Sequence, residues 1–277
     1  MTLWFAIFLG FVQGVTEFLP VSSSGHLSIF QNVFGMQNIE QNHLFFDVLL
    51  HLGTLVSVCI VYRKDIAELI SAFFALFRRG GKGEAATKHR SSIRLLIMII
   101  IATLPLAAAV ILKDYVEKLY YNVTFIGLAL IVTGLLLFIS DRIVKGKKNE
   151  KNAKMSNALI VGIAQAIAVV PGLSRSGTTI TAGLFQGFDR EFAVKFSFIM
   201  SIPAILGANI LTLIDALKAG VDLSLLPTYL AGVVAAAVSG FFAIKLVKLI
   251  SQKERFGSFA YYCWTAGLIV IVLSIII

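Results

Sequence analysis

With 277 residues, of which 58% are hydrophobic and only 14% are charged, this chain is far more apolar than a soluble domain of its length. The mean hydropathy of +0.88, together with several apolar runs long enough to cross about 30 Å of hydrocarbon, excludes a water-soluble enzyme or binding module. The net charge of +9 does not indicate a nucleic-acid partner, because the lysines and arginines gather in short connections between the apolar runs, where they orient a membrane protein.

The first apolar segment, residues 3–34, is not a simple membrane span. It carries Gln13 and Glu17 and is broken in the middle by Pro20, which is followed by three serines. It has neither a basic region before it nor a small-residue cleavage pattern after it, so we do not expect a removed signal peptide. Because interrupted helices are tolerated at membrane depth only where they line a cavity, the segment is predicted to be a re-entrant broken helix at a site.

Six other apolar runs have the length and composition of membrane-spanning helices. They are residues 44–62, 93–112, 124–140, 192–214, 228–249 and 259–277. After the first of these runs, residues 65–77 have apolar side chains at helical spacing with Arg78 and Arg79 behind them, which predicts an amphipathic helix on the membrane surface. Cys59 and Cys263 lie inside apolar runs without metal-ligand spacing, so we expect both to be small core residues.

A second broken segment, residues 157–187, resembles the first, with an interruption at Pro171 that is followed by Gly-Leu-Ser-Arg-Ser. A constant shift along the chain superposes five pairs, which are Gly10 on Gly162, Gln13 on Gln165, Ser22 on Ser174, Ser24 on Ser176 and Gly25 on Gly177. Each broken segment precedes three predicted spans. The pattern indicates one membrane domain, residues 1–277, made of two repeats, 1–150 and 151–277.

Basic residues predict how these repeats are oriented. The connections 63–94, 142–155 and 245–255 hold eight, six and four Lys or Arg, whereas 113–122 and 215–227 hold two and one. The basic connections alternate with the others as six crossings require, which places them in the cytoplasm and both termini outside. We therefore predict an all-α polytopic membrane protein with two inverted-topology repeats, each a re-entrant broken helix plus three transmembrane helices. The two polar tips would meet near the midplane, in a site that opens outward.

The first broken segment carries the residues best suited to catalysis. Gln13 and Glu17 are four positions apart and share one face of a helix, and a carboxylate in lipid is costly unless it is paired or bound to a cation. The serines at 22–24 are ordinary helix N-caps in soluble proteins, but here they gather with His26 where lipid admits few polar groups. His26 could be the nucleophile, a general acid, or a proton acceptor for Ser23.

The second broken segment has the features of an anion-binding loop. Residues 171–179 join a flexible turn, several hydroxyls, Arg175 and the start of a helix, all of which favour phosphate oxygens. A purely structural ion pair of Arg175 with Glu17 is the alternative. Outside these segments, we expect His51 to be a packed, hydrogen-bonded histidine. We also expect a solvated helix start formed by Asp189, Arg190, Glu191 and Lys195.

The segments from Gln13 to His26 and from Pro171 to Thr179 closely resemble the two signature motifs of the undecaprenyl pyrophosphate phosphatase family, also called the bacitracin-resistance family. Similarity extends through the whole chain, including residues 46–54 and 196–207. The resemblance implies a bacterial inner-membrane enzyme that hydrolyses undecaprenyl diphosphate to undecaprenyl phosphate and phosphate. That reaction recycles a carrier lipid for cell-wall polymers. The resemblance also implies a polyprenyl diphosphate lipid as partner and a divalent cation, Mg²⁺ or Ca²⁺, as cofactor.

By motif position, the resemblance assigns catalysis to Glu17, Ser23, His26 and Arg175, and the metal to Glu17 with Gln13. The substrate-binding set comprises Gln13, Ser22, Ser24, Ser174, Ser176, Gly177, Thr178 and Thr179. Gln13 is a departure, because the family's motif often begins with Glu, and it leaves Glu17 as the chief acidic candidate.

One alternative function and one assembly remain open, whereas a further phosphatase class is disfavoured. An anionic-lipid flippase or transporter would have the same inverted-repeat architecture, but it needs phosphate binding without Ser23 and His26 beside Glu17. A different membrane phosphatase class uses Ser-Gly-His with a later histidine, and no histidine follows His89. The glycine-rich spans could also pack as a homodimer.

Overall fold

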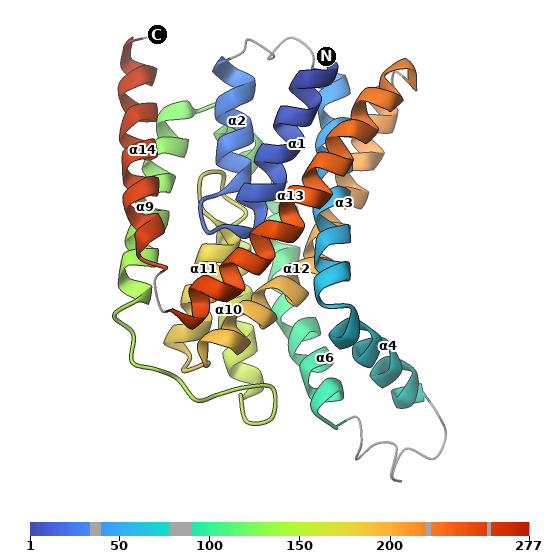
Figure 1. Ribbon diagram of the computed structural model, residues 1–277, viewed down its shortest axis with the longest axis vertical. Helices are drawn as coiled ribbons and strands as arrows, with labels where there is room; N and C mark the ends of the chain where they lie inside the picture. The colour runs from blue at the N-terminus through green and yellow to red at the C-terminus, as the bar shows by residue number, and fades with distance from the viewer. Residues whose placement is uncertain (34–39, 78–89, 220–222, 254–255, 277) are drawn as a thin grey trace.

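The computed structural model describes residues 1–33, 40–77, 90–219, 223–253 and 256–276 (Figure 1). Within them the backbone forms helices and one isolated β-bridge, between Lys148 and Phe188. The helices are α1 (Leu3–Phe18), α2 (Ser23–Val33), α3 (Glu40–Val61), α4 (Arg63–Phe77), α6 (Arg90–Thr103), α7 (Leu106–Ile111), α8 (Lys113–Tyr120), α9 (Val123–Ser140), α10 (Met155–Ile167), α11 (Arg175–Phe185), α12 (Arg190–Ala219), the 3-10 turn η2 (Leu223–Leu225), α13 (Leu226–Gln252) and α14 (Ser258–Ile276). The all-helical prediction is therefore confirmed.

The predicted membrane spans coincide with the long apolar helices of the structure. Among the described residues, five stretches are long and apolar enough to cross a membrane: Arg90–Ile111, Val123–Ser140, Arg190–Lys218, Leu226–Gln252 and Ser258–Ile275. A sixth is the pair Phe45–Val61 and Arg63–Ala75, which bends by 87° between α3 and α4. This bend turns α4 out of the direction of α3, as expected for an amphipathic helix at the membrane surface. The flanking Arg78 and Arg79, like Ile277, lie outside the described residues.

Both broken segments are helix pairs joined by a non-helical turn. The α1 helix ends before Leu19 and α2 begins at Ser23, whereas α10 ends at Ile167 and α11 begins at Arg175. The chain reverses at the first break through Ser22, whose φ of 71° is unusual for a residue with a side chain. Figure 1 shows α1 and α2 in the upper half and α10 and α11 in the lower half, so the two breaks face each other at mid-height.

Small residues allow α1 to pack directly on α13. A Cβ atom on Gly10 would lie 2.1 Å from the carbonyl oxygen of Gly232, and one on Gly14 would lie 2.4 Å from that of Ala236. The α10 helix approaches α6 in the same way, since a Cβ on Gly162 would meet the Ala102 carbonyl oxygen at 2.4 Å. Close backbone approach through glycine is how membrane helices associate without a hydrophobic driving force.

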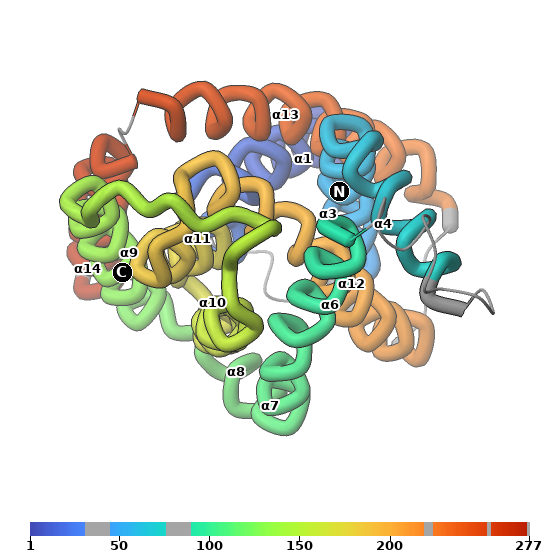
Figure 2. The backbone as a smooth tube through the Cα atoms, turned by 90° about the horizontal axis from the view of Figure 1, so that it is seen from below, coloured from blue at the N-terminus to red at the C-terminus, as the bar shows by residue number. Residues whose placement is uncertain are grey.

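The two termini lie at the same end of the molecule, and the connections richest in lysine and arginine lie at the opposite end (Figure 1). Viewed from that basic end, α13, α9 with α14, and α3 with α12 stand around α1 and α11 (Figure 2). Residues 78–89 of the first basic connection and 254–255 of the last lie outside the described part. The inverted relation of residues 1–150 to 151–277 stays a prediction.

Two expectations about individual residues were wrong. Cys59 is exposed on the outer face of α3, whereas Cys263 is buried as expected. The supposed solvated start of α12 is paired, because Arg190 lies 3.5 Å from Asp141 and Lys195 lies 2.6 Å from Asp65. Only Glu191 of that group is exposed. Cationic side chains at the rim of an apolar bundle gain more from a partner on a neighbouring helix than from partial solvation.

Candidate active site

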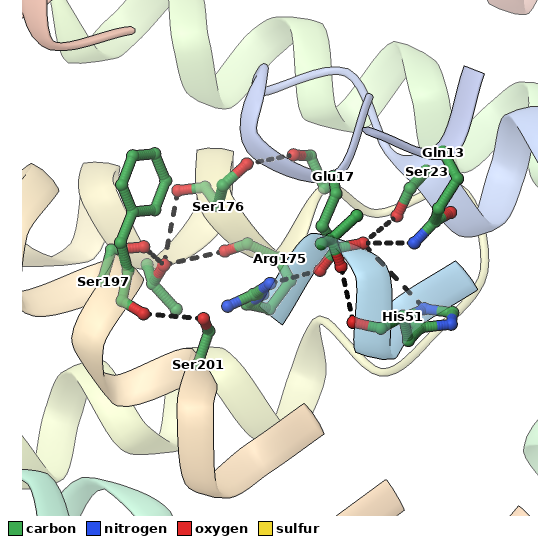
Figure 3. A network of polar contacts seen from close by, with 12 residues as sticks. Gln13, Glu17, Ser23, His51, Arg175, Ser176, Ser197 and Ser201 are labelled. Carbon is green, nitrogen blue, oxygen red and sulfur yellow. Dashed lines mark hydrogen bonds and ion pairs between the residues drawn. The ribbon is translucent and has the colours of Figure 1, made fainter. Parts of the chain in front are cut away.

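Glu17 is the centre of a polar cluster in the interior of the bundle (Figure 3). Its carboxylate is only 6% exposed and uses its two oxygens for different partners. The Oε1 atom accepts a hydrogen bond from Arg175 Nη2 at 2.5 Å. The Oε2 atom accepts from Ser23 Oγ at 2.7 Å and from Gln13 Nε2 at 3.1 Å. Three donors around one buried carboxylate stabilise its charged form, which burial alone would disfavour.

The members of this cluster come from both broken segments. Gln13 and Glu17 are one helical turn apart on the buried face of α1, as their spacing predicts. Ser23 is the first residue of α2, directly after the turn that reverses the chain. Arg175 is the first residue of α11 and comes from the other half of the sequence. The two broken segments thus bring an acid, a hydroxyl and a guanidinium into one place.

The start of α11 is held rigidly by side-chain hydrogen bonds. Ser174 is the N-cap, and its Oγ accepts from the backbone N–H of Gly177 at 3.1 Å. Thr133 on α9 accepts from the backbone N–H of Ser174 at 3.0 Å and donates to the carbonyl oxygen of Gly172 at 3.0 Å. The anchored loop fixes the direction from which Arg175 enters the cluster. Sequence reasoning missed Thr133, which looks like any polar residue inside an apolar span.

Two polar atoms at the start of α11 have no partner in the described part of the chain. The Nη1 atom of Arg175 and the Oγ1 atom of Thr178 are both buried and make no hydrogen bond. An unpaired buried polar group costs about 1–3 kcal/mol, so such groups commonly mark the position of a ligand. Both lie in the first turn of α11, whose free N–H groups and dipole favour an anion. This turn therefore offers unused donors to a phosphate group.

The other hydroxyls of the second motif have structural partners. Ser176 donates to the Leu19 carbonyl oxygen at 3.4 Å, which ties α11 to the end of α1. Thr179 shares a 2.6 Å hydrogen bond with Ser197 on α12 and donates to the Arg175 carbonyl oxygen at 2.8 Å. Ser197 lies on the opposite side of Arg175 from Glu17, so the Thr179 contact leads away from the carboxylate toward α12 (Figure 3). In this structure the two residues brace Arg175.

His26 lies outside the network around Glu17. Its Nδ1 is 2.7 Å from the carbonyl oxygen of Ser22, and its Nε2 is 2.6 Å from the hydroxyl of Tyr262 on α14. The Oγ atoms of Ser22 and Ser24 are 3.4 Å apart, and that of Ser22 accepts from the Gly25 backbone N–H. The two hydroxyls and the imidazole therefore organise the turn around Ser23. No pattern in the sequence pointed to Tyr262.

His51, which we expected to be packed, lies beside the site instead. Its Nε2 is 3.9 Å from Glu17 Oε2, and its side chain is 31% exposed. Its Nδ1 lies 2.8 Å from the carbonyl oxygen of Asp47, one turn earlier on α3. The expected hydrogen bond is therefore present, but the free nitrogen faces the carboxylate. The available signal was its place inside residues 46–54, one of the stretches that resemble the family, which sequence reasoning did not connect to Glu17.

The residues expected to hold a metal ion are adjacent, but they do not form a carboxylate cluster. Among the described residues, no group of three or more His, Cys, Asp or Glu lies close enough together to hold a metal. Gln13 is completely buried and its Oε1 has no partner there. Rotation of the amide by half a turn would direct this oxygen toward Glu17. The donors present thus fit a cation only if amide, imidazole or hydroxyl atoms supplement the single carboxylate.

Fold and site together define a polytopic membrane protein that presents a carboxylate, a hydroxyl and a guanidinium at the meeting point of two interrupted helix pairs. Membrane phosphatases and carriers of phosphorylated lipids both use groups of this kind. The chain belongs to the family described as bacitracin resistance protein BacA, whose model matches residues 6–269.

Relatives that cover the whole chain agree with this membership. A protein of Alkaliphilus metalliredigens, named undecaprenyl-diphosphatase, is 42% identical over 277 residues and covers 100% of both chains. Proteins of the same name from Halothermothrix orenii and Methanobrevibacter smithii are 40% and 43% identical. The first covers 99% of each chain, and the second covers 98% of this chain and 97% of its own. The similarity thus includes both broken segments and all the spans.

Proposed function

We propose that this chain is an undecaprenyl-diphosphate phosphatase, which hydrolyses undecaprenyl diphosphate to undecaprenyl phosphate and inorganic phosphate. Membership of the BacA family and the names of its full-length relatives support this reaction. The product would return to the cycle that builds cell-wall polymers, and its regeneration would give resistance to bacitracin. The observation that carries the proposal is the contact of Ser23 and Arg175 with the same buried carboxylate.

The geometry supports nucleophilic attack by Ser23. Its hydroxyl donates to Glu17 Oε2 at 2.7 Å, so the carboxylate orients the oxygen and can take its proton. Attack on the terminal phosphorus would form a Ser23 phosphoester and break the bridging P–O bond, releasing undecaprenyl phosphate. Water would then attack the phosphoserine, form inorganic phosphate and return the proton to Ser23. Glu17 would take the Ser23 proton in the first step and pass it to the departing phosphate oxygen, and in the second step it would take a proton from the attacking water and give it to the Ser23 oxygen.

Arg175 couples substrate binding to this chemistry. In the structure its Nη2 is bound to Glu17, whereas its Nη1 is free. A diphosphate at the start of α11 would draw the guanidinium toward its own oxygens, because a planar fork binds phosphate in a bidentate way. Glu17 would then lose its strongest donor and accept the proton of Ser23 more readily. The resting ion pair would thus give way to a competent base only when the substrate is present.

A divalent cation belongs to the proposal as the expected cofactor. When bound, it would neutralise charge on the phosphate oxygens during the transfer. Glu17 and Gln13 are the residues expected to hold it. The choice between Mg²⁺ and Ca²⁺ stays a prediction, which turnover after chelation and addition of each ion would decide.

The orientation in the membrane is also part of the proposal. Lysine and arginine accumulate at the end opposite the termini, which supports a cytoplasmic location of that end in a bacterial plasma membrane. The site would then open outward. The homodimer has weaker support than the sequence suggested, since Gly10, Gly14 and Gly162 are used inside the protomer.

The main competing function is transport of a phosphorylated lipid. A carrier needs Arg175 and the start of α11 but has no use for a serine held against a carboxylate, and the 2.7 Å contact favours the phosphatase. The deciding experiment is phosphate release from undecaprenyl or farnesyl diphosphate by the protein purified in detergent. We expect steady turnover that Glu17→Gln abolishes. Wild-type protein that binds the lipid without releasing phosphate would overturn the proposal.

A further inference from the structure

His51 is held in an orientation that leaves one ring nitrogen free beside Glu17. A carbonyl oxygen can only accept, so the contact of Nδ1 with the Asp47 carbonyl at 2.8 Å assigns the ring hydrogen to Nδ1. The lone pair of Nε2 then faces Glu17 Oε2 at 3.9 Å. Two acceptors at that distance do not bind each other. In the neutral ring two acceptors face each other here, and a positive charge between them, either a proton on Nε2 or a metal ion, makes the contact favourable.

The same space is bordered by two further donors of electron pairs. Gln13 is 0% exposed, and its Oε1 has no partner among the described residues. Its amide lies 3.1 Å from Glu17 Oε2, so a half-turn brings Oε1 to the side of the carboxylate. The hydroxyl of Ser23 is 2.7 Å from the same oxygen. Arg175 binds the other carboxylate oxygen, so Oε2 is held only by the two neutral donors Ser23 and Gln13.

We propose that His51, through Nε2, is a ligand of the divalent cation together with Glu17 and Gln13. A metal at about 2.1 Å from both Nε2 and Oε2 can bridge atoms that are 3.9 Å apart. Donation of the other ring N–H to a backbone carbonyl is the usual support of a metal-bound histidine. The His51 side chain is 31% exposed, whereas Gln13 and Glu17 are almost fully buried, so His51 is the most accessible of the three.

The inference changes the expected metal. Mg²⁺ and Ca²⁺ prefer oxygen ligands throughout, whereas imidazole suits cations such as Zn²⁺, Fe²⁺ and Ni²⁺. The site has one carboxylate and one amide where two carboxylates would bind a cation more tightly. The His51 nitrogen would therefore increase the affinity of the site for the cation. The inference rests on the proposed function, because the cation would act in phosphate hydrolysis. Cation binding can be measured independently of phosphate release.

The test is pulsed EPR of Mn²⁺ added to the purified protein, alone and with methylenediphosphonate. Coupling to a histidine nitrogen is expected in the wild type and in His26→Gln, and it should vanish in His51→Gln. The His51→Gln variant should also bind Mn²⁺ at least about tenfold more weakly, by loss of the free-ion signal. Size-exclusion profiles and thermal unfolding of both variants show whether they are folded.

Failure of this inference can be told apart from failure of the phosphatase proposal. Phosphate release is measured on the same preparations. A wild type that hydrolyses the diphosphate but shows no nitrogen coupling, or retains the coupling in His51→Gln, overturns the role of His51 alone. A wild type that binds Mn²⁺ with nitrogen coupling but releases no phosphate supports His51 as a ligand and overturns the proposed function.

Discussion

At the scale of single residues, Glu17 is the shared hydrogen-bond partner of Arg175, Ser23 and Gln13. Its neighbours are a cation on one oxygen and neutral donors on the other, so both carboxylate oxygens have hydrogen-bond partners. Removing one partner of such a buried pair costs about 3–5 kcal/mol, because the other charge is left unpaired in an apolar interior. The informative substitutions at this site therefore keep the volume or the charge of the side chain and remove one chemical group.

Ser23→Ala removes the proposed nucleophile with little change in volume. Because Ser23 is the only hydroxyl among the described residues that is hydrogen-bonded to Glu17, we expect kcat to fall about 10³-fold or more, with lipid binding retained. Phosphate release and lipid binding would be measured on the same detergent-purified sample. Ser156→Ala on the exposed start of α10 is the control and should match the wild type. Near-full turnover of Ser23→Ala would exclude attack by this serine and favour water or His26.

Arg175→Lys keeps the charge but loses the planar fork. A lysine can still reach Glu17, but it has no second nitrogen to bind the substrate while the first one is engaged. We expect kcat/KM to fall about 100-fold, the loss typical of one removed transition-state donor. Steady-state kinetics would measure it, with Arg142→Lys at the exposed end of α9 as the matched control. If Arg175→Lys and Arg142→Lys had equal kcat/KM, the diphosphate would not bind Nη1 of Arg175.

At the scale of elements, the site is precise because each break is fastened to a long helix. Thr133 on α9 fixes the loop before α11, and Ser176 ties α11 to the last residue before Pro20. Asp141 at the end of α9 accepts from the backbone N–H groups of Phe256 and Gly257, which precede α14. The helices outside the site thus act as a frame that holds two short, interrupted elements at their tips.

The contact of α1 with α13 is the most sensitive part of this frame. In Gly10→Ala the new methyl group would lie 2.1 Å from the Gly232 carbonyl oxygen, so α1 must move away from α13. We expect a loss of about 1–3 kcal/mol, seen as a lower Tm in detergent by tryptophan fluorescence. Gly207→Ala on α12 is the matched control, because nothing lies within 4 Å of its new methyl group and alanine favours the helix. A Tm drop as large in the control would contradict the steric argument.

At the scale of the whole molecule, local patterns predicted the helices and the two breaks but not the contacts between distant segments. Proline, glycine and serine in an apolar run identify Pro20 and Pro171 as interruptions, because only a cavity tolerates them. The neighbours of His26 and His51 depend on how α14 and α3 pack against the rest of the protein. The periodicity of apolar residues in one segment does not predict that packing. Cys59 was misplaced for a related reason. A helix that is apolar all round does not reveal which face meets lipid and which meets protein.

The predicted orientation of the molecule in the membrane determines on which side the site opens. If the basic end is cytoplasmic, a cysteine at Val144, which is 88% exposed in the 142–155 connection, should be shielded from outside. One at Tyr121, which is 63% exposed and precedes α9, should be accessible. In right-side-out plasma-membrane vesicles carrying variants without Cys59 and Cys263, a membrane-impermeant maleimide should label Tyr121→Cys at once and Val144→Cys only after permeabilisation. Labelling in the reverse order would place the termini in the cytoplasm and turn the site inward, so the enzyme would receive its diphosphate from the opposite leaflet.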